Sequence, residues 1–282
     1  MRLETENRTM KRLLMMGLLS ATLGIPSAAE AVNFYDGVRA LEGLYFLNYV
    51  SYYTADEVTD DKGDTALDGY GFKKVQEMVR FSYYAGRWCF HAFIPFGYKE
   101  VKFYGEDTWG LGDSNLGAGR FLPVKAVDIV PMLFVKFPTG RYDRDRKVNY
   151  GDHQYDIKPS IFLHKTLGPW TVDMALKYFY RLVNPVTHRA PHNEFYAEGL
   201  FGYEFWNFVK PGLSLNWMKS GDDKYFGEET GREAKTRESF SVGSDVYFRF
   251  NMVKLSFTYL YDAYAENTVR GHYAQMKTVY KF

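Results

Sequence analysis

The stretch TVDMALKYFYRL, residues 171–182, decides the fold because its two faces require different surroundings. Successive side chains of a β-strand point to opposite faces. One face of this stretch is charged, with Asp173, Lys177 and Arg181. The other is apolar throughout: Val172, Met174, Leu176, Tyr178, Tyr180 and Leu182. A charged face and an unbroken apolar face cannot both be buried in a sandwich core, so the stretch predicts a strand between lipid and a polar interior.

The same alternation recurs along the chain. It is clear in residues 88–99, 209–218 and 253–262. Pro95 and Pro211 each remove a ladder donor and predict local irregularity. With these segments included, we expect about twelve strands, at 42–54, 69–85, 87–100, 109–122, 125–138, 153–167, 169–183, 193–205, 208–219, 236–250, 252–263 and 269–282.

The connections between these segments alternate between two lengths. Short turns are expected near 85–87, 123–124, 168–169, 206–207 and 251, and long polar loops near 55–68, 101–108, 139–152, 184–192, 220–235 and 264–268. This layout is typical of outer-membrane barrels, and an open sheet edge is excluded in hydrocarbon. The sequence therefore predicts an all-β fold, a closed antiparallel up-and-down transmembrane β-barrel. The rival is a secreted β-sandwich or lipocalin-like barrel, which needs one inward apolar face and a polar exterior.

The N-terminal residues indicate export. Lys11 and Arg12 precede an apolar core, Leu13 to Ile25, and Ala29-Glu30-Ala31 supplies a small-x-small cleavage pattern. We therefore expect a signal peptide at 1–31, with Met10 as the true start, and a barrel at 42–282. The alternative is a buried N-terminal helix. Residues 32–41 could form a small plug or a disordered periplasmic lead-in.

Composition narrows the function classes. Lys+Arg is 35 and Asp+Glu is 34, which gives no clustered basic excess and no reason to expect nucleic acid. Aromatic residues make up 18% of the chain, which suits surfaces that are apolar yet touch water at one end. The single cysteine, Cys89, excludes an intramolecular disulfide and a cysteine-based zinc site.

Two motifs in the middle of the chain resemble a known family. Trp109-Gly110-Leu111-Gly112-Asp113 opens one expected strand, and Lys136-Phe137-Pro138-Thr139-Gly140-Arg141-Tyr142-Asp143 closes the next. Their order and spacing are similar to the signature of the phenol meta-pathway family of outer-membrane proteins. The resemblance runs from about residue 105 to the C-terminus and is specific across 109–143. It implies a transporter-like outer-membrane barrel, in some members associated with aromatic degradation. The motif glycines and Pro138 also favour structural roles at bends and turns.

Alternation places a series of charged residues on the inward face of the barrel. These candidate pore-lining residues are Arg80, His91, Asp128, Lys136, Lys158, His164, Asp173, Lys177, Arg181, Glu194, Glu198, Glu204, Lys210, Asp245, Arg249, Lys254 and Lys277. They either line a polar conduit or pair across neighbouring strands and fill the lumen. Both signs of charge occur, which argues against strong ion selectivity. Phe93, Phe162 and Phe179 share this face and would suit a solute with an apolar part.

Three functions follow as hypotheses. The first is a passive outer-membrane channel or transporter for small, partly hydrophobic or aromatic molecules. The second is a structural or adhesion barrel with a closed lumen, and the third is an outer-membrane lipid hydrolase. We expect no enzyme, because no nucleophile motif accompanies a histidine, and no cofactor or metal. The expected partners are outer-membrane lipids, lipopolysaccharide, a small solute, and the barrel assembly machinery through the terminal Phe282.

Overall fold

The wall of the molecule is a sheet whose strands are apolar on the outside and polar on the inside. In β9 (Trp170–Arg181), Met174 is 42% exposed, whereas Asp173 on the opposite face is fully buried. In β15 (Val253–Glu266), Phe257 is 44% exposed and Thr258 is 3% exposed. This inverts the arrangement of a soluble protein. The expectation of an apolar exterior around a charged interior is confirmed.

The computed structural model describes residues 32–221, 224–225, 236–250 and 253–282. The expected signal peptide, the expected turn at 251 and most of the expected loop at 220–235 lie outside these residues. Among the described residues, no helix has the length and apolar character to cross a bilayer.

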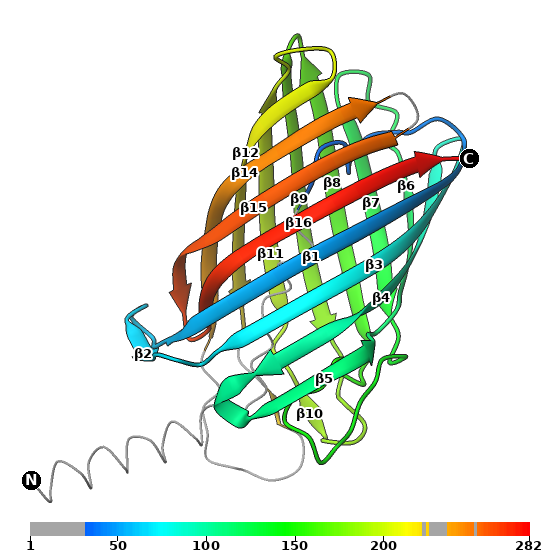
Figure 1. Ribbon diagram of the computed structural model, residues 1–282. Helices are drawn as coiled ribbons and strands as arrows, with labels where there is room; N and C mark the ends of the chain where they lie inside the picture. The colour runs from blue at the N-terminus through cyan, green and yellow to red at the C-terminus, as the bar shows by residue number, and fades with distance from the viewer. Residues whose placement is uncertain (1–31, 222–223, 226–235, 251–252) are drawn as a thin grey trace, which may run out of the picture.

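The main sheet closes on itself through antiparallel pairing of its first and last strands (Figure 1). Tyr45 of β1 lies opposite Lys281 of β16, so the two ends of the barrel sequence meet at one rim. Fourteen strands form the sheet. β2 is a three-residue extension, and β5 and β6 are two parts of one wall strand. The barrel wall therefore has twelve strand positions, here called staves, as predicted. Their bounds are β1 Gly43–Thr59, β2 Thr65–Leu67, β3 Phe72–Ala85, β4 Trp88–Val101, β5 Glu106–Leu111, β6 Asn115–Arg120, β7 Asp128–Lys136, β8 Asp156–Leu167, β9 Trp170–Arg181, β11 Glu194–Tyr203, β12 Val209–Ser220, β14 Glu238–Phe250, β15 Val253–Glu266 and β16 Val269–Lys281.

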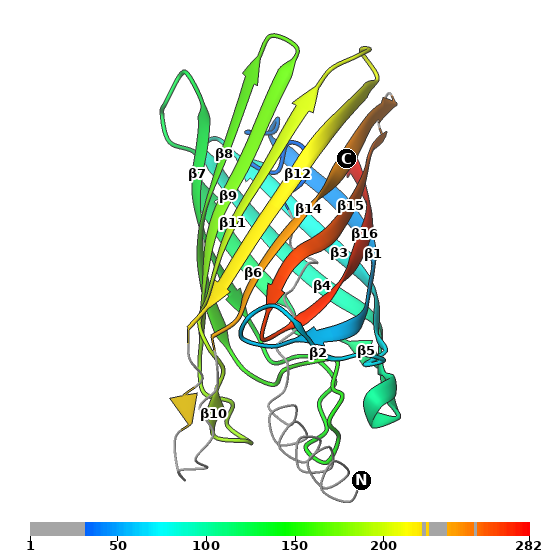
Figure 2. The same ribbon diagram turned by 90° about the vertical axis from the view of Figure 1, so that its left-hand side faces the viewer.

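The barrel has a turn rim and a loop rim. The turn rim carries the C-terminus and the short connections, and the loop rim carries the longer segments, the 3₁₀ helix η2 (Lys102–Tyr104) and the small sheet of β10 (Arg189–Ala190) and β13 (Lys224–Tyr225) (Figures 1 and 2). Several expected connections differ in length, among them the turn at 206–207, which spans 204–208. The 264–268 loop is a two-residue turn, because β15 continues to Glu266. The 101–108 loop is mostly η2, and the expected turn at 123–124 spans 121–127.

The fourth stave is divided, in contrast to the continuous strand expected at 109–122. β5 and β6 each pair with β4, but residues 112–114 leave the ladder and the Gly112 amide donates to the Pro95 carbonyl. The irregularity predicted at Pro95 is therefore confirmed. The one predicted at Pro211 is wrong. The β12–β14 register runs through Pro211 without a shift, and the β11–β12 ladder already ends at Gly212.

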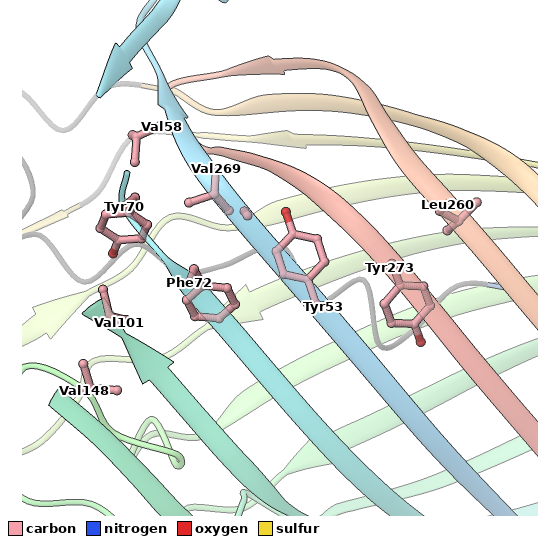
Figure 3. Packing of buried hydrophobic residues seen from close by; sticks show 10 residues of the cluster. Tyr53, Val58, Tyr70, Phe72, Val101, Val148, Leu260, Val269 and Tyr273 are labelled. Carbon is pink, nitrogen blue, oxygen red and sulfur yellow. The ribbon is translucent and has the colours of Figure 1, made fainter. Parts of the chain in front are cut away.

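The lumen contains an apolar cluster near the loop rim. Tyr53, Phe72, Leu260, Val269 and Tyr273 come from β1, β3, β15 and β16 and lie side by side on the inner wall (Figure 3). Val148 and Tyr70, from the loop-rim connections, also belong to the cluster. Part of the lumen at the loop rim is thus packed like a protein core, which fixes these connections to the wall.

Candidate functional site

The N-terminal segment 32–41 lies inside the barrel, near the turn rim (Figure 2). Val32, Asn33 and Phe34 are at most 2% exposed. Phe34 fits against two paired glycines, Gly202 of β11 and Gly212 of β12. A Cβ atom at Gly212 would approach the Phe34 Cζ to 2.7 Å, and one at Gly202 would clash with the same ring. The wall is therefore shaped to receive this aromatic side chain.

Polar contacts hold the segment to several staves. The Asn33 Nδ2 donates to Thr258 Oγ1 at 3.0 Å, and the Tyr35 amide donates to Asp173 Oδ1 at 3.2 Å. The Lys277 ammonium pairs with Asp36 at 2.6 Å. These groups belong to β15, β9 and β16. Because the contacts come from opposite sides of the barrel, the segment spans the lumen rather than following one strand.

The Asp36 carboxylate also shapes the segment itself. Its Oδ2 accepts the Asn33 amide at 2.9 Å, and the Asp36 amide donates back to the Asn33 carbonyl at 3.2 Å. Such a reciprocal turn is a common use of Asn and Asp side chains. Tyr35, between them, adopts a φ of +66°, in the left-handed region.

A cavity of about 90 Å³ lies inside the barrel, between Asp36 of the segment and residues of β1, β3, β4, β6, β7, β8 and β9. Asp36 contributes to its floor, and its walls combine cationic, aromatic and thioether side chains. The cations are Arg80, Lys158 and Lys177. The apolar groups are Met78, Phe93, Met132, Phe134, Phe162 and Phe179. The cavity is several times larger than one water molecule needs.

The cations of the cavity lie against its aromatic rings. Lys158 Nζ is 4.3 Å from the Phe179 ring centroid, and Arg80 Cζ is 5.0 Å from that of Phe93. These distances are within the range of cation–π attraction. Lys177 also pairs with Glu198 at 2.8 Å. The arrangement can accommodate a molecule with both an apolar and a negatively charged part.

The other predicted inward residues are distributed between the two ends of the lumen. Arg181 and Glu194 lie near the loop rim with Lys136, and Asp245, Lys210, His164 and Asp173 lie around the segment 32–41. Asp128 contacts the Arg39 amide at the turn rim, while Arg249 and Lys254 are exposed there. His91 contacts Arg80 at 3.2 Å, and Glu204 lies 3.4 Å from Lys210. Of the predicted charged series, only Arg80, Lys158 and Lys177 line the cavity.

Asp36 is one of the cavity residues that the sequence did not reveal, and the only acidic one among the described lining residues. It lies outside the strands, so the alternation of side chains along a strand could not predict whether it faces the lumen. The signal that could have revealed it is the Asn33-x-x-Asp36 spacing, which suits a turn rather than an extended lead-in. Tyr49, Met132 and Phe134 follow the same alternation as their strands and were also overlooked.

His164 and Asp173 form a buried cross-strand pair, with 2.7 Å between Nδ1 and Oδ1. His164 Nε2 lies 3.2 Å from Thr166 Oγ1. This resembles a base with its orienting carboxylate, but Asp173 also binds the Tyr35 amide and the Tyr35 ring lies against His164. The pair therefore anchors the segment 32–41. Among the described residues, no group of three or more His, Cys, Asp or Glu is arranged to hold a metal.

The two family-like motifs meet at the loop rim. Asp113, from the gap between β5 and β6, accepts the Gly140 amide at 2.9 Å and the Asp152 amide at 2.8 Å. A Cβ atom at Gly140 would lie 2.8 Å from the Gly151 Cα, so the two arms of the 137–155 loop touch through glycines. The motifs therefore fasten this loop to the barrel wall.

Electrostatic attraction reinforces the same junction. Lys136 pairs with Asp156 at 2.8 Å and with Asp152 at 2.9 Å. Desolvation would raise the pKa of the Asp152 carboxyl, but the charges of Lys136, Lys99 and Arg181 outweigh it and hold that pKa below its usual range. Asp152 is consequently an anion at neutral pH and remains paired.

Replacing Asp113 by Ala is expected to release the 137–155 loop. The substitution leaves two backbone amides without their acceptor, at about 1–3 kcal/mol each when such groups are buried. Limited trypsin digestion at Arg141, Arg144, Arg146 and Lys147 should be faster in Asp113→Ala than in the wild type. Asp113→Asn keeps one carbonyl oxygen and should be intermediate. Equal cleavage rates in all three proteins would show that Asp113 does not fasten the loop.

Comparisons with known proteins place the chain among barrel proteins. A family model described as "Putative MetA-pathway of phenol degradation" matches residues 54–278. The solved COG4313 outer membrane channel from Pseudomonas putida F1 has a TM-score of 0.80 at 17% identity, covering 89% of this chain and 100% of that one. The NanC porin has a TM-score of 0.51 at 8% identity, covering 84% and 100%. The β domain of the Bordetella autotransporter BrkA has a TM-score of 0.50 at 11% identity, covering 86% and 100%. No curated protein sequence matches.

Proposed function

Because the chain belongs to the phenol-degradation family whose model it matches, we propose that it is a passive outer-membrane channel for small, partly hydrophobic molecules. The observation that carries the proposal is the inverted barrel: a closed wall, apolar outside, around a polar lumen with an aromatic cavity. A closed sheet leaves no unpaired edge in hydrocarbon. The COG4313 protein, with the same fold, is described as an outer membrane channel.

The proposed orientation follows the rims. The turn rim and both ends of the barrel would face the periplasm, and the loop rim the outside. Residues 1–31 would be the export signal, residues 32–41 a plug, and residues 42–282 the barrel. The terminal Phe282, 68% exposed and next to Tyr280, is available to the assembly machinery. Membrane lipids and lipopolysaccharide would surround the wall.

The plug and the cavity suggest how passage is controlled. A solute that enters at the loop rim would reach the cavity and then meet the segment 32–41. The segment has to move before the solute can leave at the turn rim. We therefore expect low conductance in the resting protein, with brief larger openings when the segment detaches. No catalytic step is part of this proposal.

Recording from planar bilayers tests the proposed function. The purified, detergent-extracted protein is expected to give discrete current steps after insertion. The Asp113→Ala variant, recorded in the same way, tests whether the 137–155 loop limits the current independently of the plug. Complete absence of steps, in preparations whose heat-modifiable migration proves a folded barrel, would refute the channel.

One polar pair interrupts the apolar exterior at mid-strand. Asn48 Nδ2 of β1 donates to Glu77 Oε1 of β3 at 2.8 Å. The neighbouring outward residues Val50, Val75 and Phe96 are apolar and exposed. Lipid-facing acidic groups at mid-bilayer destabilise a barrel, though less than basic ones.

The double substitution Asn48→Leu/Glu77→Leu should therefore stabilise the barrel by about 1 kcal/mol in phospholipid vesicles. Reversible urea unfolding monitored by tryptophan fluorescence measures this change. Replacing both partners avoids an orphaned amide. A loss of stability instead would mean that this face contacts water or protein rather than lipid.

A further inference from the structure

Arg80 is a buried cation without a close carboxylate partner. Its side chain lies on the cavity wall and the residue is 8% exposed. Three side chains hold the guanidinium: Nε donates to Ser82 Oγ and NH1 to Tyr49 Oη, both at 3.0 Å, and NH2 lies 3.2 Å from His91 Nδ1. Among the described residues, the one acidic group within 4 Å is Asp36, at 3.8 Å from NH1. This distance is beyond a hydrogen bond. A desolvated guanidinium gains most from a bidentate carboxylate, and none of these partners provides one.

The surroundings of Arg80 favour a flat apolar body next to that carboxylate. The Phe93 and Phe134 rings lie edge to face at 5.8 Å, beside the guanidinium. Phe162 and Phe179 line the same space, together with Lys158 and Lys177. The lining of the cavity therefore combines aromatic rings with three cations, of which Lys177 is already paired with Glu198 at 2.8 Å. Its single acidic lining residue among those described, Asp36, comes from the plug and not from the wall.

Asp36 already occupies part of the position that a ligand carboxylate would take. It bridges Lys277, at 2.6 Å, and Arg80, at 3.8 Å. An anion bound to Arg80 would repel Asp36 and weaken its attraction to that cation. Binding of an anion in the cavity and docking of the plug are therefore coupled through the Asp36 carboxylate, and each disfavours the other.

We propose that the cavity is a binding site for a small aromatic carboxylate, and that Asp36 of the plug is its internal competitor for Arg80. The inference rests on the proposed channel function, since it names the solute class that the channel would admit. The ligand carboxylate pairs with Arg80, and its ring lies among Phe93, Phe134 and Phe162. Occupation of the site loosens the plug from inside.

Isothermal titration of the full mature protein in detergent tests the site, with benzoate and its neutral analogue benzamide as probes. Benzoate should bind at least about tenfold more tightly than benzamide, because a charge-assisted hydrogen bond is lost in the amide. Arg80→Gln should weaken benzoate about tenfold or more and leave benzamide nearly unchanged. Asp36→Asn should tighten benzoate, because the competitor is removed. Lys165→Gln, a cation on the outer face of the same strand as Lys158, should change neither.

Arg80→Gln is expected to weaken benzoate binding and Asp36→Asn to strengthen it. These opposite effects distinguish a binding site from a structural role. If Arg80→Gln fails to fold, Lys158→Gln and Asp36→Asn still provide the comparison. Equal binding of benzoate and benzamide, no binding of either, or no tightening in Asp36→Asn would overturn the site. The titration needs no membrane, so its failure leaves the current steps intact as evidence for a channel. Conversely, benzoate binding without any current would leave the site and refute the channel.

Discussion

Deleting residues 33–40 is expected to raise the single-channel conductance several-fold. The segment crosses the lumen and is held by Asp173, Thr258 and Lys277 from different staves. Its removal opens the turn-rim half of the lumen, leaving the cavity and the loop rim as the remaining constrictions. The wall itself makes its ladder contacts without the segment, so the deleted protein should still form the barrel. Conductance in planar bilayers is the measurement.

A milder variant guards against an effect of the deletion on assembly. Gly202→Val places a side chain where the Phe34 ring now packs. It should displace the segment without shortening the chain and should raise the frequency of large openings. Gly199→Val, on the same stave, meets nothing within 4 Å and serves as the matched control. Unchanged currents in both the deletion and Gly202→Val would show that the segment does not limit passage.

Replacing Glu194 by Ala should destabilise the barrel by about 3–5 kcal/mol, the usual effect of removing one partner from a buried ion pair. Glu194 is fully buried. Its Oε2 accepts Arg181 NH2 at 2.6 Å and Tyr196 Oη at 2.7 Å, and its Oε1 accepts Arg237 NH2 at 2.7 Å. Without it, two guanidinium groups remain close together in the lumen without their shared carboxylate. Urea unfolding in lipid vesicles measures the loss.

Glu238→Ala provides the comparison for Glu194. Glu238 also pairs with a cation, Lys219, at 2.9 Å, but the two side chains are 27% and 53% exposed. Exposed pairs contribute at most about 1 kcal/mol. Nearly equal losses in the two variants would mean that Glu194 is solvated in the membrane-inserted protein, contrary to its burial in the lumen.

The barrel could be predicted from sequence because side chains alternate strictly between the two faces of a strand. One face of each strand meets lipid, whereas the other meets a polar lumen. Asp173 and Lys177 had to face inward once Met174 and Leu176 faced outward, and the structure confirms both sides. Closure followed from the cost of an unpaired edge in hydrocarbon. Connection lengths were less predictable, since β15 continues through Tyr264 and Ala265 to Glu266, where a polar loop was expected.

The site was only half predictable for a different reason. Alternation gives the side on which a residue lies but not its height or its neighbours. Arg80, Lys158 and Lys177 were therefore identified together with residues such as Arg249 and Lys254, which are far along the lumen at the turn rim. The position of Asp36 depends on contacts with β3 and β16, more than 40 residues away in the chain. No local pattern contains that information.

The partners of the inward charged residues also change what these charges imply about ion selectivity. Counted along the sequence, the inward series holds nine Lys or Arg and six Asp or Glu, so both signs of charge occur. In the structure, Glu194 pairs with Arg181 and Glu198 with Lys177, and the described cavity lining holds three cations, Lys177 among them, and the plug carboxylate. The expectation of weak selectivity therefore becomes one of preference for anions at the cavity.

Liposome swelling with solutes of graded size tests the central claim most directly, because it reports the widest molecule that can cross the barrel. Proteoliposomes of the wild type should admit only the smallest solutes, and those carrying the 33–40 deletion should also admit distinctly larger ones. An identical size limit in the two preparations, or no swelling in either, would contradict a lumen closed by its own N-terminal segment.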